Sequence, residues 1–149
     1  MDSIYKLMHS KSPRIEPLDY QNIVEKYAAK GGVKEKDATK FFENYWMPFA
    51  WAAILGFIND KSLPLDESNC LQPFKFQTIY NGSEEIFFAL MLMAVGKEGY
   101  DILKDSSKMT KVIEEHAKGG FQLINTDLIE KGEDYYSDHN NFLVEILER

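Results

Sequence analysis

Three consecutive residues, Glu114, Glu115 and His116, are the side chains in this 149-residue sequence best suited to chemistry. Carboxylates beside an imidazole can transfer protons or hold a divalent metal ion, which is the chemistry of a metal-dependent hydrolase or nuclease. No second histidine follows at a four-residue step, so the spacing of a helical zinc protease is absent. Neighbouring residues on a helix also point in different directions, and ordinary solvation or packing explains all three. We expect His116 to donate a hydrogen bond to a backbone carbonyl at the buried edge of a helix.

The other nucleophiles and the glycine pairs lack the neighbours that catalysis or phosphate binding needs. Cys70 is the single cysteine, in a loop of Asp, Ser, Asn and Pro without a basic partner close in the sequence. No serine has the Gly-x-Ser-x-Gly frame, and the pairs Gly31-Gly32 and Gly119-Gly120 do not have the spacing of a dinucleotide fingerprint. The sequence therefore predicts no catalytic residue, no cofactor and no metal. A single cysteine also excludes an intrachain disulfide and favours the reducing cytoplasm.

Charge is distributed unevenly along the chain, whose formal net charge is −7. Residues 1–40 carry eight Lys and Arg against six Asp and Glu, whereas residues 98–149 carry six against twelve. An acidic surface repels the phosphate backbone, so we expect no direct nucleic-acid binding. The acidic last third leaves one alternative open, in which rows of carboxylates imitate DNA and occupy a partner's DNA channel.

Two runs of ten apolar residues, Phe49–Ile58 and Ile86–Val95, must form the framework for these polar segments. A helix that is apolar on all sides is buried on all sides. Ten residues of helix reach about 15 Å, roughly half the hydrocarbon thickness of a bilayer, so neither run spans a membrane. The runs predict the centre of an all-α domain, a single compact unit of five or six helices over residues 18–149. A partly ordered arm at residues 1–17 precedes it.

Capping residues and helix breakers delimit the other elements. Ser83, followed by two glutamates, predicts the start of the second apolar helix. Three- and four-residue spacing favours one long helix from Ser106 or Ser107 to about Ile129, continuous through Gly119-Gly120. The alternative left open is that the glycines end the helix after Lys118. The remaining expected elements are a helix from Pro17–Asp19 to Lys30 that is capped by Gly31-Gly32 and buries Leu18, a helix at 48–58, a long loop at 61–76, a short extended segment near 74–79, a helical turn at 100–104 and a last helix at 137–147.

Three segments, taken together, resemble a known group of proteins. They are an apolar helix ending in Gly56-Phe57 with Pro64-Leu65 in the loop after it, the second apolar helix, and the pattern Glu-Glu-x-Ala-x-Gly-Gly at 114–120. Over residues 41–147 this layout is similar to the small helical proteins associated with bacterial DNA-phosphorothioation (Dnd) defence systems. His116 stands where a tyrosine is expected, and residues 1–40 have no counterpart in the resemblance. The resemblance implies a role beside DNA-modification or restriction enzymes in defence against phage, and it brings no catalytic motif.

These observations favour a non-enzymatic, cytoplasmic accessory protein that binds another protein of a bacterial DNA-modification or restriction system. Its contact surface would be either the loop at 61–76 or the acidic C-terminal face, and a homo-oligomer stays open. The candidate partner-contact residues are Pro64, Leu65, Asp66, Glu114, Glu115, His116, Gly119 and Gly120. The alternatives are the acidic DNA mimic and a metal-dependent hydrolase or nuclease component that uses the carboxylates around His116.

Overall fold

The computed structural model describes residues 3–28 and 42–131. Within these ranges, all secondary-structure elements are helical and no strand is formed. The helices are α1 (Ile4–His9), α2 (Pro17–Asp19), α3 (Glu25–Tyr27), α4 (Trp46–Ile58), α5 (Phe76–Gly82), α6 (Glu84–Glu98) and α7 (Ser106–Lys131). A π-helical segment, Tyr20–Val24, joins α2 to α3, and 3-10 turns lie at Glu67–Asn69 and Tyr100–Lys104. The all-α prediction is confirmed.

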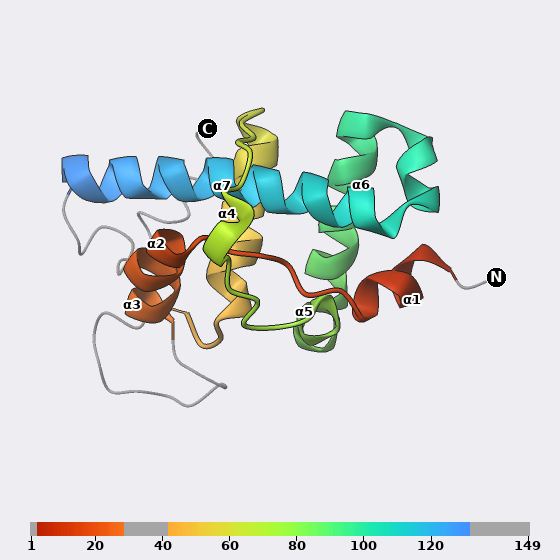
Figure 1. The fold of residues 1–149 in the computed structure, drawn as a ribbon, viewed down its shortest axis with the longest axis horizontal. Coiled ribbons are helices and arrows are strands. Elements are labelled where there is room, and N and C mark those ends of the chain that lie inside the picture. Colours follow the sequence, from red (N-terminus) through yellow and green to blue (C-terminus); the bar gives the residue numbers. More distant parts are fainter. Residues whose placement is uncertain (1–2, 29–41, 132–149) are drawn as a thin grey trace.

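Helices α4 and α7 form the centre of the fold. Figure 1 shows α7 running the length of the molecule and α4 crossing it, with α2 and α3 at one end and α1 and α6 at the other. The first apolar run lies in α4, where Phe49, Ala52 and Leu55 are fully buried, although Ile58 at the end of the run is 43 % exposed. Helix α4 begins two residues before Pro48, because the proline is compatible with the first helical turn, where its missing N–H has no helical partner.

The second apolar run lies in α6, and only part of it is buried. Ser83 caps the helix as expected, its Oγ accepting a hydrogen bond from the Ile86 N–H at 3.2 Å. Leu90 is fully buried, yet Phe88 is 39 % and Leu92 is 69 % exposed. The expectation that this helix is covered on all sides is therefore wrong, because α6 packs on the edge of the α4–α7 pair and keeps one apolar face outside.

The segment near 74–79, for which an extended conformation was expected, is helical instead. Phe76 and Ile79 are the buried residues of α5, and a separation of three residues places them on one face of a helix. Burial of that face against α1, α4 and α6 outweighs the strand preference of Phe, Thr, Ile and Tyr, which depends on context. Asn81 and Gly82 consequently form the last turn of α5.

Helix α7 is continuous through Gly119-Gly120, as predicted, and extends to Lys131. Its cap differs from the predicted serine, because the Asp105 Oδ1 accepts the Lys108 N–H at 3.0 Å. The predicted turn at residues 100–104 is confirmed as the 3-10 turn Tyr100–Lys104.

The segment expected to be a partly ordered arm contributes to the core. It forms α1, and it places Met8 and Ile15 among the fully buried side chains. The helical stretch that follows ends at Tyr27, and Leu18 is 69 % exposed although it was expected on the buried side. The predicted cap at Gly31-Gly32 and the predicted last helix at 137–147 lie outside the described residues. None of the described helices is both long enough and apolar enough to cross a membrane.

Candidate functional site

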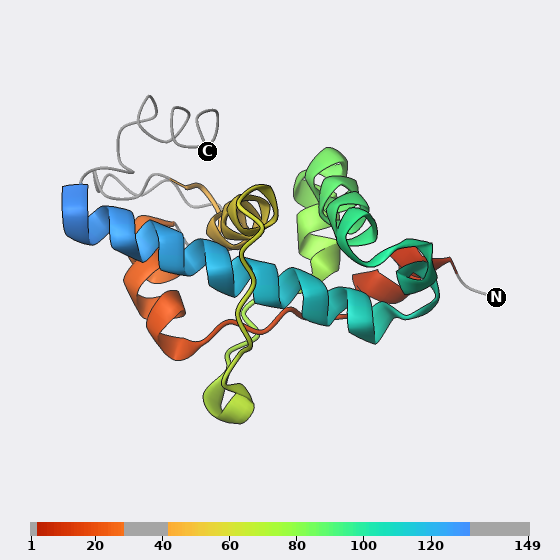
Figure 2. The same ribbon diagram turned by 90° about the horizontal axis from the view of Figure 1, so that it is seen from above.

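The loop between α4 and α5 crosses α7 over the segment that carries the Glu-Glu-x-Ala-x-Gly-Gly pattern. Figure 2 shows this loop leaving α4, passing over α7 and forming a 3-10 turn that stands away from the helices, after which the chain returns to α5. The Leu63 N–H donates to the Glu115 carbonyl at 3.0 Å, and Ile15 and Leu71 exchange two backbone hydrogen bonds of 2.8 Å. The sequence pattern on α7 and the loop are therefore parts of one structure, which we call the α7 junction: residues 14–19, 61–71 and 114–120.

The glycines of the pattern allow backbones to touch. A Cβ added at Gly119 would overlap the carbonyl oxygen of Lys61, and one at Gly120 would overlap the carbonyl oxygen of Ala52 in α4. On the other side of the same contact, Gly56 lies against the carbonyl of His116. The absence of side chains at these three positions sets the distance between α4, the loop and α7.

Glu114 is buried in an ion pair with Arg14. Its side chain is 2 % exposed, and its Oε2 accepts the Arg14 backbone N–H and Nε–H at 2.6 Å and 3.1 Å. Its Oε1 accepts the Arg14 Nη2–H at 3.0 Å. The hydrogen bonding of its guanidinium to the Glu114 carboxylate raises the pKa of Arg14, although burial acts in the opposite direction. Arg14 also forms an ion pair with Glu67 at 3.1 Å. Its guanidinium therefore connects the N-terminal segment to α7 and to the 3-10 turn at 67–69, which we call the projecting turn.

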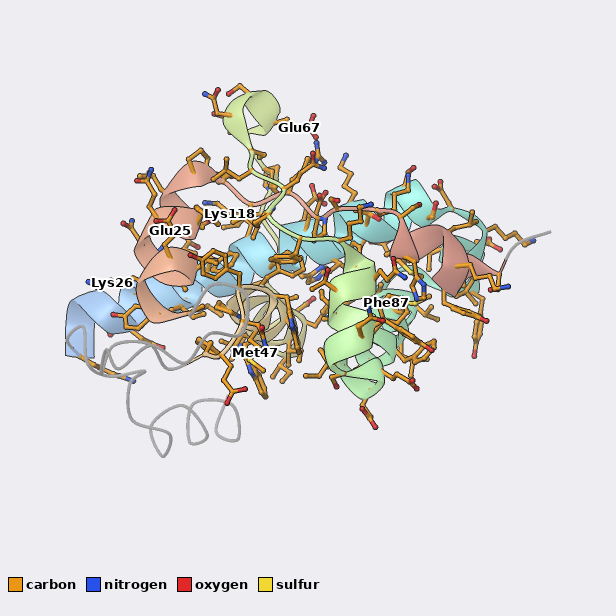
Figure 3. All side chains as sticks on the ribbon, turned by 90° about the horizontal axis from the view of Figure 1, so that it is seen from below. Glu25, Lys26, Met47, Glu67, Phe87 and Lys118 are labelled. Carbon is orange, nitrogen blue, oxygen red and sulfur yellow. The ribbon has the colours of Figure 1, made fainter. Side chains whose placement is uncertain are left out.

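A second charged cluster lies one turn further along α7. Lys118 Nζ is 3.1 Å from Glu16 Oε1 and 3.1 Å from Asp19 Oδ2, and Figure 3 shows Lys118 between α7 and the helical stretch that begins with α2. The Asn125 amide donates a longer bond of 3.4 Å to Asp19. Burial raises the pKa of Asp19 in spite of Lys118, while for Lys118 burial is outweighed by the two carboxylates, which raise its pKa.

Replacing Lys118 by methionine is expected to lower the free energy of unfolding by about 2 kcal/mol at neutral pH, because it leaves the buried Asp19 carboxylate without its cation. The raised pKa of Lys118 means that its contribution is present below about pH 10.4 and is lost as the pH rises through the folded-state value. Urea unfolding at several pH values checks this. The two proteins should converge in alkali, and equal stabilities at pH 7 would contradict the prediction.

The other two residues of the candidate motif have structural contacts. The His116 Nδ1 lies 2.8 Å from the Val112 carbonyl, in agreement with the predicted hydrogen bond to a backbone carbonyl, and its ring stacks on Phe57 with centroids 4.0 Å apart. Glu115 is half-buried and lines a small surface pocket of about 120 Å³ with Arg14, Pro64 and Lys111. In the described part of the chain, no three His, Cys, Asp or Glu side chains are grouped closely enough to hold a metal ion.

The tip of the loop is exposed but internally hydrogen-bonded. Asp66 accepts hydrogen bonds from the Ser68 N–H and hydroxyl at 3.2 Å and 2.8 Å, which lower the pKa of Asp66. The Asp66 N–H donates to Glu16 at 3.1 Å, and the Cys70 thiol donates to the Asp66 carbonyl at 3.2 Å. Burial raises the pKa of the Cys70 thiol, so this cysteine is a poor nucleophile. The tip is thus held in one conformation while its side chains face solvent.

The structure brings all eight predicted partner-contact residues to the α7 junction, but they have different roles. Pro64 and Asp66 are exposed, Leu65 and Glu115 are half-buried, and Glu114, His116, Gly119 and Gly120 are buried. Sequence reasoning missed Arg14 and Lys118, since their partners lie about a hundred residues away along the chain. The one signal in the sequence was Asp19. A carboxylate that is buried needs a cation beside it, so burial of this residue would have predicted a lysine or arginine partner.

One comparison of the sequence with known proteins found a match. Residues 17–148 match the family described as DNA sulphur modification system-associated protein 4. The match begins at residue 17, so the expectation that the first forty residues have no counterpart is wrong for residues 17–40. Comparisons with curated proteins and with solved structures found no match. The chain belongs to the DNA sulphur modification system-associated protein 4 family, and it is therefore a Dnd-associated protein.

Proposed function

We propose that this chain is a non-catalytic accessory protein that binds another protein of a Dnd system through the projecting loop of the α7 junction. The observation that carries the proposal is how the motif residues are used. The Glu114 carboxylate is paired with Arg14, and Gly119 and Gly120 allow the backbones of the loop and of α4 to contact α7. The pattern therefore fixes the position of the loop on α7.

The loop has the properties of a preformed recognition element. Its base is fixed to Ile15 and Glu115 by backbone hydrogen bonds, and its tip is braced by Arg14 and Glu16. A loop ordered before binding loses little conformational entropy when a partner docks. Binding residues are commonly found on loops held by a rigid scaffold. The exposed Asn69 at the tip supplies a polar contact, and the exposed side chain of Leu71, next to the base, supplies an apolar one.

The test is to produce the chain together with each of the other proteins of a Dnd system in turn, and to measure affinity by calorimetry for any pair that co-purifies. A variant with Asn69→Arg and Leu71→Arg should bind at least about tenfold more weakly, because it changes the centre of the proposed contact. Both side chains are exposed, so the fold should be retained.

Gln122→Arg provides the matched control, since Gln122 is exposed on α7 outside the α7 junction. This variant should bind as the wild type does. Failure of the wild-type chain to bind any protein of the system would contradict the proposal, and so would full binding by the double loop variant.

A further inference from the structure

The extended segment between α1 and α2 fills a groove between α7 and the loop that precedes α5. We call this segment, residues 11–16, the strap, and Figure 1 shows it crossing the molecule between α1 and α2. The groove is formed by residues 63–76 and by the part of α7 around Glu114. These groove residues lie within the family match at 17–148, whereas the strap precedes the match. The strap is therefore a segment from outside the matched unit that is bound to that unit.

The strap contacts the loop as an extended peptide pairs with an extended segment of its receptor. Ile15 and Leu71 exchange two backbone hydrogen bonds of 2.8 Å in antiparallel orientation. At the other end of the strap, the Lys11 carbonyl accepts the Phe76 N–H at 2.9 Å. Main-chain hydrogen bonds supply affinity for a peptide of any sequence, so selectivity must come from the side chains.

Two neighbouring side chains of the strap are recognised in different ways. The Arg14 Nε–H and Nη2–H bond to the two carboxylate oxygens of Glu114 at 3.1 Å and 3.0 Å, and Nη1 lies 3.1 Å from Glu67. A lysine ammonium cannot form this paired arrangement. Ile15 is 2 % exposed, at a recess that Phe121 of α7 also lines. The groove therefore fits a planar cation followed by a branched apolar side chain.

We propose that this groove is a binding site for an extended peptide that carries an arginine followed by a branched apolar residue, and that the strap is its exchangeable occupant. The Glu114 side chain in the groove is 2 % exposed, and a buried carboxylate is costly to leave without a cation. Burial of Glu114 therefore favours an occupied groove, whether the arginine comes from the strap or from another segment of the same chemistry.

This site is separate from the exposed tip through which we propose that the loop binds a Dnd protein. The two are linked at Glu67, because exchange of the strap removes the Arg14 ion pair that braces the projecting turn. The test of the groove needs no partner protein, so either proposal can fail without the other.

The test uses the full chain with a recognition sequence for a site-specific protease inserted between Glu16 and Pro17. After cleavage, residues 1–16 should stay bound, and a fluorescently labelled synthetic peptide of the same residues should exchange with them, as measured by fluorescence anisotropy. The uncut chain should bind no labelled peptide at micromolar concentration, because its tethered strap has an effective concentration of about millimolar.

Variant peptides test the selectivity of the groove. A peptide with Arg14→Lys should bind the cut chain at least about tenfold more weakly than the native peptide, because it loses the paired bonds to Glu114. A peptide with Lys6→Gln is the matched control, since Lys6 is exposed on α1 outside the strap, and it should bind as the native peptide does.

Four results would overturn the proposal. Unfolding of the cut chain while the uncut chain stays folded would show that the strap belongs to the core and is not a ligand. Retention of the cut segment against excess labelled peptide would show that the strap does not exchange. Equal binding by the Arg14→Lys peptide would remove the selectivity, and binding of labelled peptide to the uncut chain would place the peptide elsewhere on the protein.

Discussion

Gly120→Ala is expected to destabilise the protein by about 3 kcal/mol, although alanine is the better helix former by about 1 kcal/mol. The added Cβ would overlap the carbonyl oxygen, carbonyl carbon and Cα of Ala52, which are all backbone atoms of α4. Neither helix can move one atom aside, so α4 and α7 must separate along their contact. Because both helices form the core, the loss appears as global unfolding at lower urea concentration.

The matched control for this prediction is Gly96→Ala in α6. Gly96 is also inside a helix, but a Cβ added there has no atom within 4 Å. Helix propensity alone then determines the change in the free energy of unfolding, and this substitution should stabilise the protein by about 0.5–1 kcal/mol. Urea unfolding monitored by circular dichroism measures both variants. If Gly120→Ala were as stable as the wild type, the proposed backbone contact between α4 and α7 would be wrong.

Arg14→Met should cost about 3 kcal/mol of folding stability, because breaking a buried ion pair on one side leaves an uncompensated charge. Glu114 would keep the backbone N–H of residue 14 and lose both hydrogen bonds from the guanidinium. Glu67 would lose its partner as well, which releases the brace on the projecting turn.

A double-mutant cycle separates the cost of the stranded charge from the loss of packing. Arg14→Met combined with Glu114→Met should be clearly more stable than Arg14→Met alone, since no buried charge remains. Lys97→Met serves as the control. It breaks the 2.6 Å contact with Asp60, an exposed pair, and should change stability little. An Arg14→Met protein as stable as Lys97→Met would show that the buried pair is not needed for stability.

The sequence by itself determined the elements that depend on local patterns. The uninterrupted apolar run of α4, the Ser83 cap of α6, and the three- and four-residue spacing of α7 each act through neighbours within one or two helical turns. These signals are local, so they predicted the all-α class and the continuity of α7. The Glu-Glu-x-Ala-x-Gly-Gly pattern lies in the α7 junction, but the sequence did not assign the buried ion pair or the backbone contacts to its residues.

Only the tertiary structure decided which surfaces each element buries. The segment at 76–82 is a helix because Phe76 and Ile79 face the core together, against its own strand preference. Leu92 is exposed because α6 sits at the edge of the fold, although it lies in an apolar run as uninterrupted as the one in α4. Arg14 reaches Glu114 across a hundred residues of chain. Burial and pairing between distant segments depend on how the helices are arranged in space, and the pattern within one helix does not encode that arrangement.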